Sequence, residues 1–193
     1  MSTIVAVRKR DRACIAADSL TTFGSTRQGA AFDTDWDKIQ RFGDTYIGVV
    51  GSAAHHHVVR SLFRRELQDA DFRGADALFE TFRRAHAVLK EKYYLNPKDS
   101  DEDPYESSQI DALVVNAYGV FGVYSLREVY AYERFWAIGS GEDFALGAMQ
   151  AVYDREDSAE TIARIGIEVS AELNNATALP MSSYAATLEP ASR

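Results

Sequence analysis

The sequence predicts an α+β protein built in layers, because strands and helices occur in separate blocks along the chain. The first third of the 193 residues consists of short β-branched and apolar runs divided by turn residues. Two amphipathic segments of helical period follow, then more strands, a second pair of helices and a short last strand. Regular alternation of strand and helix would instead indicate a doubly wound parallel sheet.

The N-terminal segment predicts a β-hairpin. Residues 3–7 and 13–17 are apolar, and the charged residues 8–12 separate them, which is typical of two strands joined by a short turn. Residues 19–37 are polar and rich in Gly, Thr and Asp, so we expect a loop or an irregular hairpin there.

A second strand pair and two helices follow. Residues 38–42 and 46–50 flank the turn dipeptide Gly43-Asp44 and predict the strand pair. Residues 59–67 and 78–93 have apolar side chains at helical spacing and predict two amphipathic helices. The apolar stripes consist of Val59, Leu62, Phe63 and Leu67 in the first helix and Leu78, Phe82, Ala85 and Leu89 in the second.

In the second half of the chain, predicted strands again come before predicted helices. Between the halves, residues 96–108 contain two prolines and an acidic run, so we expect a solvated insertion loop. Asp157, with Glu160 three residues later, is expected to cap the last helix. The predicted strands are 110–117, 120–124, 129–132 and 135–138, the helices are 142–154 and 158–174, and the final strand is 182–188.

Composition favours one soluble globular domain over residues 1–193. There is no internal repeat and no clear linker. The formal net charge of −8 disfavours a nucleic-acid binder and an anionic membrane surface as partners. Cys14 is the only cysteine, so no intrachain disulfide is possible, and no apolar stretch is long enough to cross a bilayer. We expect a cytoplasmic protein without a cofactor or a metal.

The start of the chain carries the first chemical signal. Methionine before a small residue is usually trimmed in cells, and removal of Met1 would give Ser2 a free α-amine beside its own hydroxyl. An α-amine titrates near ~8, so part of it is an unprotonated base at neutral pH. Such an amine can activate a hydroxyl nucleophile. Many proteins begin with Met-Ser, however, so this feature alone does not identify an enzyme.

Further polar residues stand at the ends of the predicted strands. Asp18 closes the second strand, Lys38 opens the third and Gly51 closes the fourth. If neighbouring strands pair, these residues and Ser2 gather at one edge. Lys38 could then lower the pKa of the Ser2 amine and hydroxyl, Asp18 could hold Lys38, and the Gly51 N–H could stabilise an oxyanion.

These features together resemble the proteasome β-type family and, within it, the HslV-like peptidases. The similar segments are Ser2–Arg8, Ala16-Ala17-Asp18-Ser19, Lys38-Ile39, Val50-Gly51-Ser52-Ala53 and Ala137-Ile138-Gly139-Ser140-Gly141, together with a last helix and turn from Ser158 to Thr177. The resemblance covers nearly the whole chain. It implies a four-layer αββα sandwich of two antiparallel sheets between helix layers.

The resemblance also implies roles for individual residues. Ser2 would be the nucleophile and its own amine the base, with Asp18 and Lys38 tuning the pair. The other implied residues are Ser140 as a support of the nucleophile, Gly51 as the oxyanion donor, Thr22, Gly51, Ser52 and Ala53 as binders of the substrate backbone, and Glu172 and Thr177 as supporting residues. The reaction would be hydrolysis of peptide bonds in unfolded polypeptides through an acyl-enzyme.

The sequence departs from the family pattern in four places. One is Leu20, which stands where many members carry a polar or charged side chain. In the other three, serine stands where the family usually has threonine, the loop 24–37 is longer than in typical HslV, and 96–108 is an acidic insertion. These departures are similar to the beta-proteobacterial proteasome homologue. That branch implies a homo-oligomeric, tetradecameric double ring of seven-fold symmetry, with or without an ATPase unfoldase.

Three other interpretations stay open. An N-terminal-nucleophile amidohydrolase could act on small amides, and a non-catalytic ring or scaffold subunit would retain Met1. The run His55-His56-His57 invites a metal-site interpretation, but consecutive helical residues point in different directions, so a polar helix start is favoured.

Overall fold

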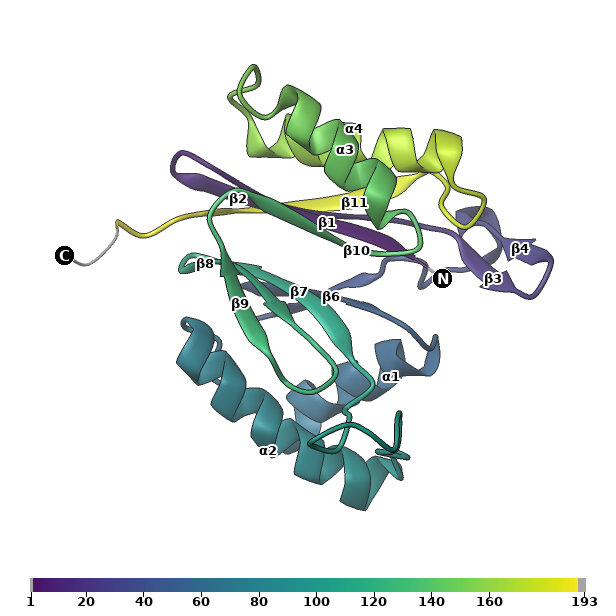
Figure 1. Cartoon of the computed structure of the whole chain (residues 1–193), viewed down its shortest axis with the longest axis vertical. Helices are drawn as coiled ribbons and strands as arrows, with labels where there is room; N and C mark the ends of the chain where they lie inside the picture. The colour runs from purple at the N-terminus through teal and green to yellow at the C-terminus, as the bar shows by residue number, and fades with distance from the viewer. Residues whose placement is uncertain (1, 191–193) are drawn as a thin grey trace.

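The computed structural model describes residues 2–190 and arranges them in four layers (Figure 1). Two antiparallel sheets face each other, and helices cover the outer face of each sheet. The α+β class, with two antiparallel sheets between helix layers, is thereby confirmed. Met1, whose removal the sequence analysis expects, lies outside the described residues.

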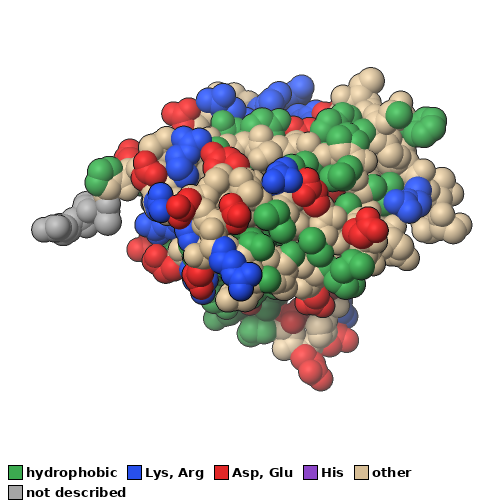
Figure 2. Space-filling model, turned by 90° about the horizontal axis from the view of Figure 1, so that it is seen from above, with side chains coloured by type: hydrophobic (Ala, Val, Ile, Leu, Met, Phe, Trp, Pro, Cys, Tyr) green, Lys and Arg blue, Asp and Glu red, His purple; other side chains and the backbone are tan. Residues whose placement is uncertain are grey.

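The first sheet has the strand order β10-β1-β2-β11 and is covered by α3 and α4. Its strands are β1 (Thr3–Lys9), β2 (Arg12–Asp18), β10 (Phe135–Gly139) and β11 (Met181–Thr187), and its helices are α3 (Glu142–Val152) and α4 (Ala159–Leu173). The N-terminal strand is therefore central, with a partner on each side. Figure 2 looks down on this helical face, where acidic, basic and apolar side chains are interspersed.

The second sheet has the order β5-β6-β7-β8-β9 and is covered by α1 and α2. Its strands are β5 (Ile39–Phe42), β6 (Thr45–Val50), β7 (Asp111–Asn116), β8 (Gly119–Val123) and β9 (Val129–Tyr132), and the helices are α1 (Ala54–Ser61) and α2 (Ala75–Tyr93). Between them, Leu62–Glu66 forms a short π-helix, η2.

Alternating side chains of β1 build two different cores. Ile4 and Ala6 pack between the sheets, whereas Val5 and Val7 pack under α3 and α4. Because successive strand residues point to opposite faces, a strand buried on both sides must be apolar throughout. This requirement explains the unbroken apolar run near the N-terminus.

The structure differs from the sequence prediction in local details. The segment 19–37 contains a small separate hairpin, β3 (Thr21–Phe23) with β4 (Thr26–Gln28), and a 3₁₀ turn, η1 (Ala30–Phe32). The predicted cap of the last helix is wrong by one residue: the Ser158 side chain accepts the N–H of Thr161. Within residues 2–190, no helix is both long and apolar enough to span a membrane.

Candidate active site

The ends of five segments meet at one edge of the two sheets. Ser2 precedes β1, Asp18 ends β2, Lys38 precedes β5, Gly51 follows β6, and Ser140 follows β10. Antiparallel pairing accounts for much of this arrangement, because Thr3 of β1 lies opposite Gly139 of β10 and Ile4 lies opposite Ala17 of β2.

Asp18 is the centre of the hydrogen-bond network at this edge. Its side chain is fully buried and accepts four donors. Oδ1 accepts the Thr3 N–H at 2.9 Å and the Lys38 ammonium at 2.7 Å; Oδ2 accepts the N–H groups of Leu20 at 2.9 Å and Ala178 at 3.3 Å. A buried carboxylate needs such compensation, since an unpaired charge away from water is costly. Asp18 thus links the start of β1 to Lys38.

Lys38 is held between two oxygens. Its Nζ also donates to the Leu20 carbonyl at 2.7 Å, and its side chain is only 11% exposed. Burial lowers the pKa of Lys38 below its ordinary value, and the charge of Asp18 opposes part of that shift. The result is a cation fixed in one place at the edge where β1 begins.

Gly139 allows the chain around Ser2 to pass close to β10. The Ser140 N–H donates to the Ser2 carbonyl at 2.8 Å. A Cβ on Gly139 would lie 2.0 Å from that same carbonyl oxygen and 3.3 Å from Val50 Cγ1, and the φ of Gly139 is +98°. Only glycine fits such a position. Ser2, Ser140 and the end of β6 are therefore neighbours.

A second polar network joins β1 to α4. The Thr3 hydroxyl accepts the Gly141 N–H at 3.1 Å and lies 2.6 Å from the Thr177 hydroxyl. The Ser170 hydroxyl donates to the Gly141 carbonyl at 2.9 Å, and Asn174 Nδ2 donates to the Ser140 carbonyl at 2.8 Å. These contacts fix the turn that carries Ser140.

Three members of this network were not expected from the sequence: Thr3, Ser170 and Asn174. Thr177, which was expected near the site, is fully buried and bonds to Thr3. Glu172 lies exposed in the last turn of α4. The sequence at the end of the last helix contains no signal that distinguishes Asn174 from the neighbouring Asn175.

The segment after β6 forms an open turn. Gly51 has a φ of +109°, and Ser52 and Ala53 are exposed. The Ser52 carbonyl accepts the His55 N–H at 3.0 Å, which starts α1. Thr22 lies half-buried in the β3–β4 hairpin, which projects from the same end of the molecule (Figure 1).

The three consecutive histidines point to different surroundings. The His55 ring lies beside Gly51, His56 contacts Arg60 and Gln40, and His57 is exposed. Among the described residues, no group of three or more His, Cys, Asp or Glu side chains is placed to hold a metal ion.

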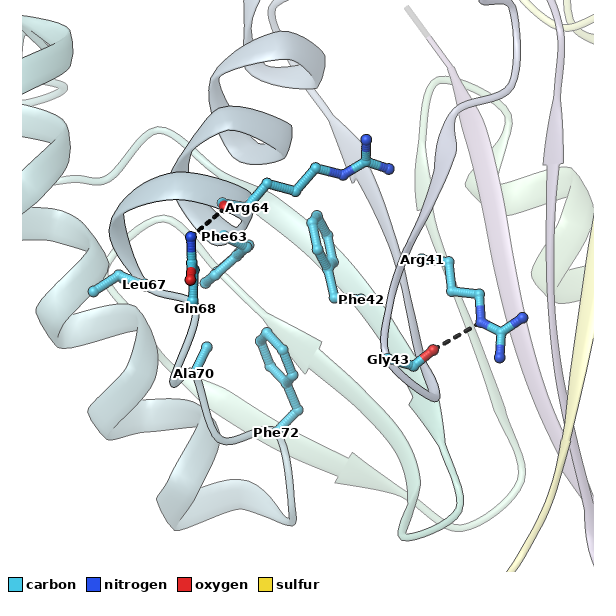
Figure 3. Close-up of a pocket in the computed structure, with 9 residues that line it drawn as sticks. All are labelled: Arg41, Phe42, Gly43, Phe63, Arg64, Leu67, Gln68, Ala70 and Phe72. Atoms are coloured by element: carbon cyan, nitrogen blue, oxygen red, sulfur yellow. Dashed lines mark hydrogen bonds between the residues drawn. The ribbon is translucent and has the colours of Figure 1, made fainter.

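A large cleft borders this edge, and a smaller pocket lies away from the predicted site residues. The cleft, of about 650 Å³, borders the edge through Ile138 and Glu142, and Glu142 accepts the Gly139 N–H at 2.9 Å. The pocket in Figure 3 is smaller, about 360 Å³, and has an aromatic wall of Phe42, Phe63 and Phe72. None of the residues predicted for the active site lines that pocket.

Known proteins resemble this chain over most of its length. A family model described as a proteasome subunit matches residues 1–174. The ATP-dependent protease subunit HslV of Caldanaerobacter subterraneus subsp. tengcongensis is 27% identical over 181 residues, covering 89% of this chain and 90% of that protein.

Solved structures extend the similarity to three dimensions. BPH of Thiobacillus denitrificans is 36% identical and covers 97% of this chain, with TM-scores of 0.91 alone and 0.89 in complex with epoxomicin. These alignments cover 99% and 100% of the respective BPH chains. Eukaryotic HslV from Trypanosoma brucei shares the fold, at 20% identity and a TM-score of 0.73 over 96% of this chain and 99% of that one.

Proposed function

Because this chain belongs to the proteasome subunit family of N-terminal-nucleophile peptidases, we propose that it hydrolyses peptide bonds through an acyl-enzyme on Ser2. The observation that carries this proposal is the buried Asp18 carboxylate, which binds both the Thr3 N–H and Lys38. A charged lysine is thereby held at the strand end that presents Ser2.

Before the enzyme can react, Met1 is removed, which frees the amine of Ser2. That amine takes the proton of the Ser2 hydroxyl while Oγ attacks the carbonyl carbon of the scissile bond. Collapse of the tetrahedral intermediate breaks the C–N bond, and the protonated amine gives its proton to the leaving nitrogen. Water then attacks the ester, with the amine again as base, and releases the acid product and free Ser2.

Lys38 and Asp18 tune this chemistry in the proposed mechanism. The ammonium of Lys38 favours the alkoxide form of the Ser2 hydroxyl, because opposite charges attract. It also favours the neutral form of the Ser2 amine, because the protonated amine would have the same charge as Lys38. Asp18 keeps Lys38 charged despite burial. Serine supplies the same hydroxyl as threonine but lacks the methyl group that restricts the rotamer.

The remaining predicted residues support binding and the transition state. The Gly51 N–H would donate to the developing oxyanion. Ser140 would support the Ser2 amine, and Thr177 and Glu172 would be further supporting residues. Thr22, Ser52 and Ala53 would hold the substrate backbone as an added strand between the β3–β4 hairpin and the turn after β6.

The proposed substrates are unfolded polypeptides. They would be cleaved inside a homo-oligomeric double ring of fourteen subunits. The support is the family itself and the similarity to a relative named as the subunit of an ATP-dependent protease. An ATPase unfoldase is therefore a candidate partner, supported by that relative alone.

The intact mass of untagged protein, before and after a peptide epoxyketone, tests the proposed chemistry. That reagent closes a ring with both the hydroxyl and the free amine of an N-terminal nucleophile. We expect a mass that lacks methionine and one adduct per subunit, which the Ser2→Ala variant loses. Retained methionine without an adduct would refute the proposal and favour a non-catalytic ring subunit.

A further inference from the structure

The turn that carries Gly51 has a backbone conformation that few residues other than glycine adopt. Its φ of +109° lies in the region that favours glycine, the residue with the greatest conformational freedom. A Cβ on Gly51 would meet only the His55 ring, at 3.4 Å from Nδ1, and the Gln109 carbonyl, at 3.8 Å. An oxyanion donor must nevertheless be fixed before the reaction, since its value depends on preorganisation.

His55 is the side chain best placed to restrain this turn. Its ring lies in the first turn of α1, directly against Gly51. Nδ1 is buried and has no hydrogen-bond partner at normal distance among residues 2–190. A buried polar atom without a partner is uncommon and calls for an explanation.

The nearest backbone acceptor to be considered for this ring is the carbonyl of Val50, the residue that precedes Gly51. Burial lowers the pKa of His55, whereas interaction with the Val50 backbone and the charge of Asp111 on β7 raise it. Burial is the largest of these influences, so the imidazole is neutral at neutral pH and carries one N–H.

The peptide group between Val50 and Gly51 would connect a hydrogen bond from His55 to the proposed oxyanion donor. The carbonyl of Val50 and the N–H of Gly51 belong to the same planar, trans peptide and point in opposite directions. A donor on the carbonyl therefore fixes the direction of the N–H and polarises it. No other histidine of the run does this, because His56 faces Arg60 and His57 is exposed.

We propose that His55 is a positioning residue that donates from its ring to the Val50 carbonyl and so aims the Gly51 N–H at the oxyanion. The inference rests on the proposed function, in which Gly51 supplies that donor. His55 does not touch the substrate. It acts through the Val50–Gly51 peptide, in the transition state more than in substrate binding.

Three variants separate this role from simple packing. His55→Asn keeps an N–H near the place of Nδ1, and His55→Leu keeps volume but removes the donor. His57→Leu is the exposed control. On a fluorogenic peptide, we expect His55→Leu to lower kcat about 10-fold with KM within about twofold, whereas His55→Asn and His57→Leu retain most of kcat. Equal losses in both His55 variants, an effect on KM alone or unchanged kcat in His55→Leu would overturn the proposal.

A spectroscopic readout decides the hydrogen bond even if the peptidase proposal fails. Solid-state NMR of protein labelled with ¹⁵N-histidine distinguishes a protonated from a bare Nδ1, and His55→Asn assigns the signal. We expect Nδ1–H at neutral pH; a bare Nδ1 would refute the bond to Val50. If wild type forms no epoxyketone adduct, the Ser2 mechanism fails separately, and the NMR result still tests His55.

Discussion

At the scale of single residues, the candidate site depends on charges and close approaches that leave little tolerance. Asp18 is completely buried, yet each of its oxygens has two donors. Lys38 is buried beside it, and its pKa is lowered mainly by burial. Removing either partner would leave an uncompensated buried charge, which is strongly destabilising. Substitutions that keep the charges are therefore more informative than deletions.

The lowered pKa of Lys38 predicts an alkaline limb in the rate profile. If the charged ammonium is needed, kcat/KM rises as the Ser2 amine loses its proton, below the ~8 that is ordinary for an α-amine, and falls as Lys38 loses its own, below the ordinary 10.5. Lys38→Arg keeps the charge at high pH, so whatever activity it retains should lack the falling limb. The measurement is kcat/KM against pH for both proteins. The same falling limb in Lys38→Arg would show that another group causes it.

Gly139 provides a stability prediction with a matched control. Gly139→Ala places a methyl group 2.0 Å from the Ser2 carbonyl oxygen at a φ of +98°, so the backbone around Ser2 must move. We expect a loss of more than ~2 kcal/mol in the free energy of unfolding and loss of the epoxyketone adduct. Gly147→Ala, in α3 with open space around it, should gain up to ~1 kcal/mol and keep the adduct. Denaturant unfolding and intact mass measure both effects.

At the scale of elements, the residues at strand ends could be predicted from the sequence, whereas the contacts made where a helix crosses a strand could not. Within each sheet, antiparallel pairing dictates which ends of neighbouring strands meet, so Asp18 could be assigned to the edge of Ser2, and Lys38 to the edge of Gly51. The approach of these two edges to one another depends on how the two sheets pack. Thr3 and Ser170 carry no comparable signal. Each resembles an ordinary strand or helix residue, and its role appears only where α4 crosses β1 and the Gly141 turn.

The short strands β3 and β4 and the π-helix η2 could not be predicted from the sequence, for a related reason. The strands β3 and β4 are too short to show a periodic pattern, and they lie within a polar segment. The π-helix η2 continues the apolar spacing of α1, so its change of hydrogen bonding leaves no trace in the pattern. Both elements depend on tertiary packing.

The start of α4 distinguishes the predicted cap from the observed one. Ser158 accepts the Thr161 N–H at 3.0 Å, whereas Asp157 is exposed and pairs with Arg10 at 2.6 Å. Ser158→Ala should therefore cost about 1 kcal/mol in the free energy of unfolding. Asp157→Ala should cost less than ~0.5 kcal/mol, since exposed ion pairs contribute little. Thermal or denaturant unfolding of the two variants compares them; a larger loss in Asp157→Ala would contradict the observed cap.

At the scale of the whole molecule, the layered architecture explains how a strand terminus becomes a candidate active site. β1 lies in the middle of its sheet and is buried on both faces, so the residue that precedes it is held by its neighbours rather than free. The family resemblance predicted this architecture. Composition and periodicity alone predicted only blocks of strands and helices, because the pairing of sheets face to face has no local sequence signal.

The surface of the single chain argues for further assembly. Several aromatic side chains are largely exposed, among them Phe23 at 59%, Phe32 at 82% and Tyr130 at 54%. Exposed aromatic side chains are enriched where proteins contact one another. Phe23 and Phe32 belong to the β3–β4 hairpin and the 3₁₀ turn after it, beside the Thr22 proposed to bind substrate. A neighbouring subunit packed there would enclose that end of the molecule.

Native mass spectrometry tests the assembly. The proposed double ring predicts a complex of fourteen-fold the mass of one 21.4 kDa chain, less its initiator methionines. Because Ser2 lies at the site rather than on the exposed aromatic surface, Ser2→Ala should assemble identically. Phe32→Ser, which removes the most exposed phenylalanine, should shift the distribution towards smaller species. A dodecamer would indicate six-fold rings. A monomer in wild type would refute self-compartmentalisation. The chemistry of Ser2 would still be tested separately by its epoxyketone adduct.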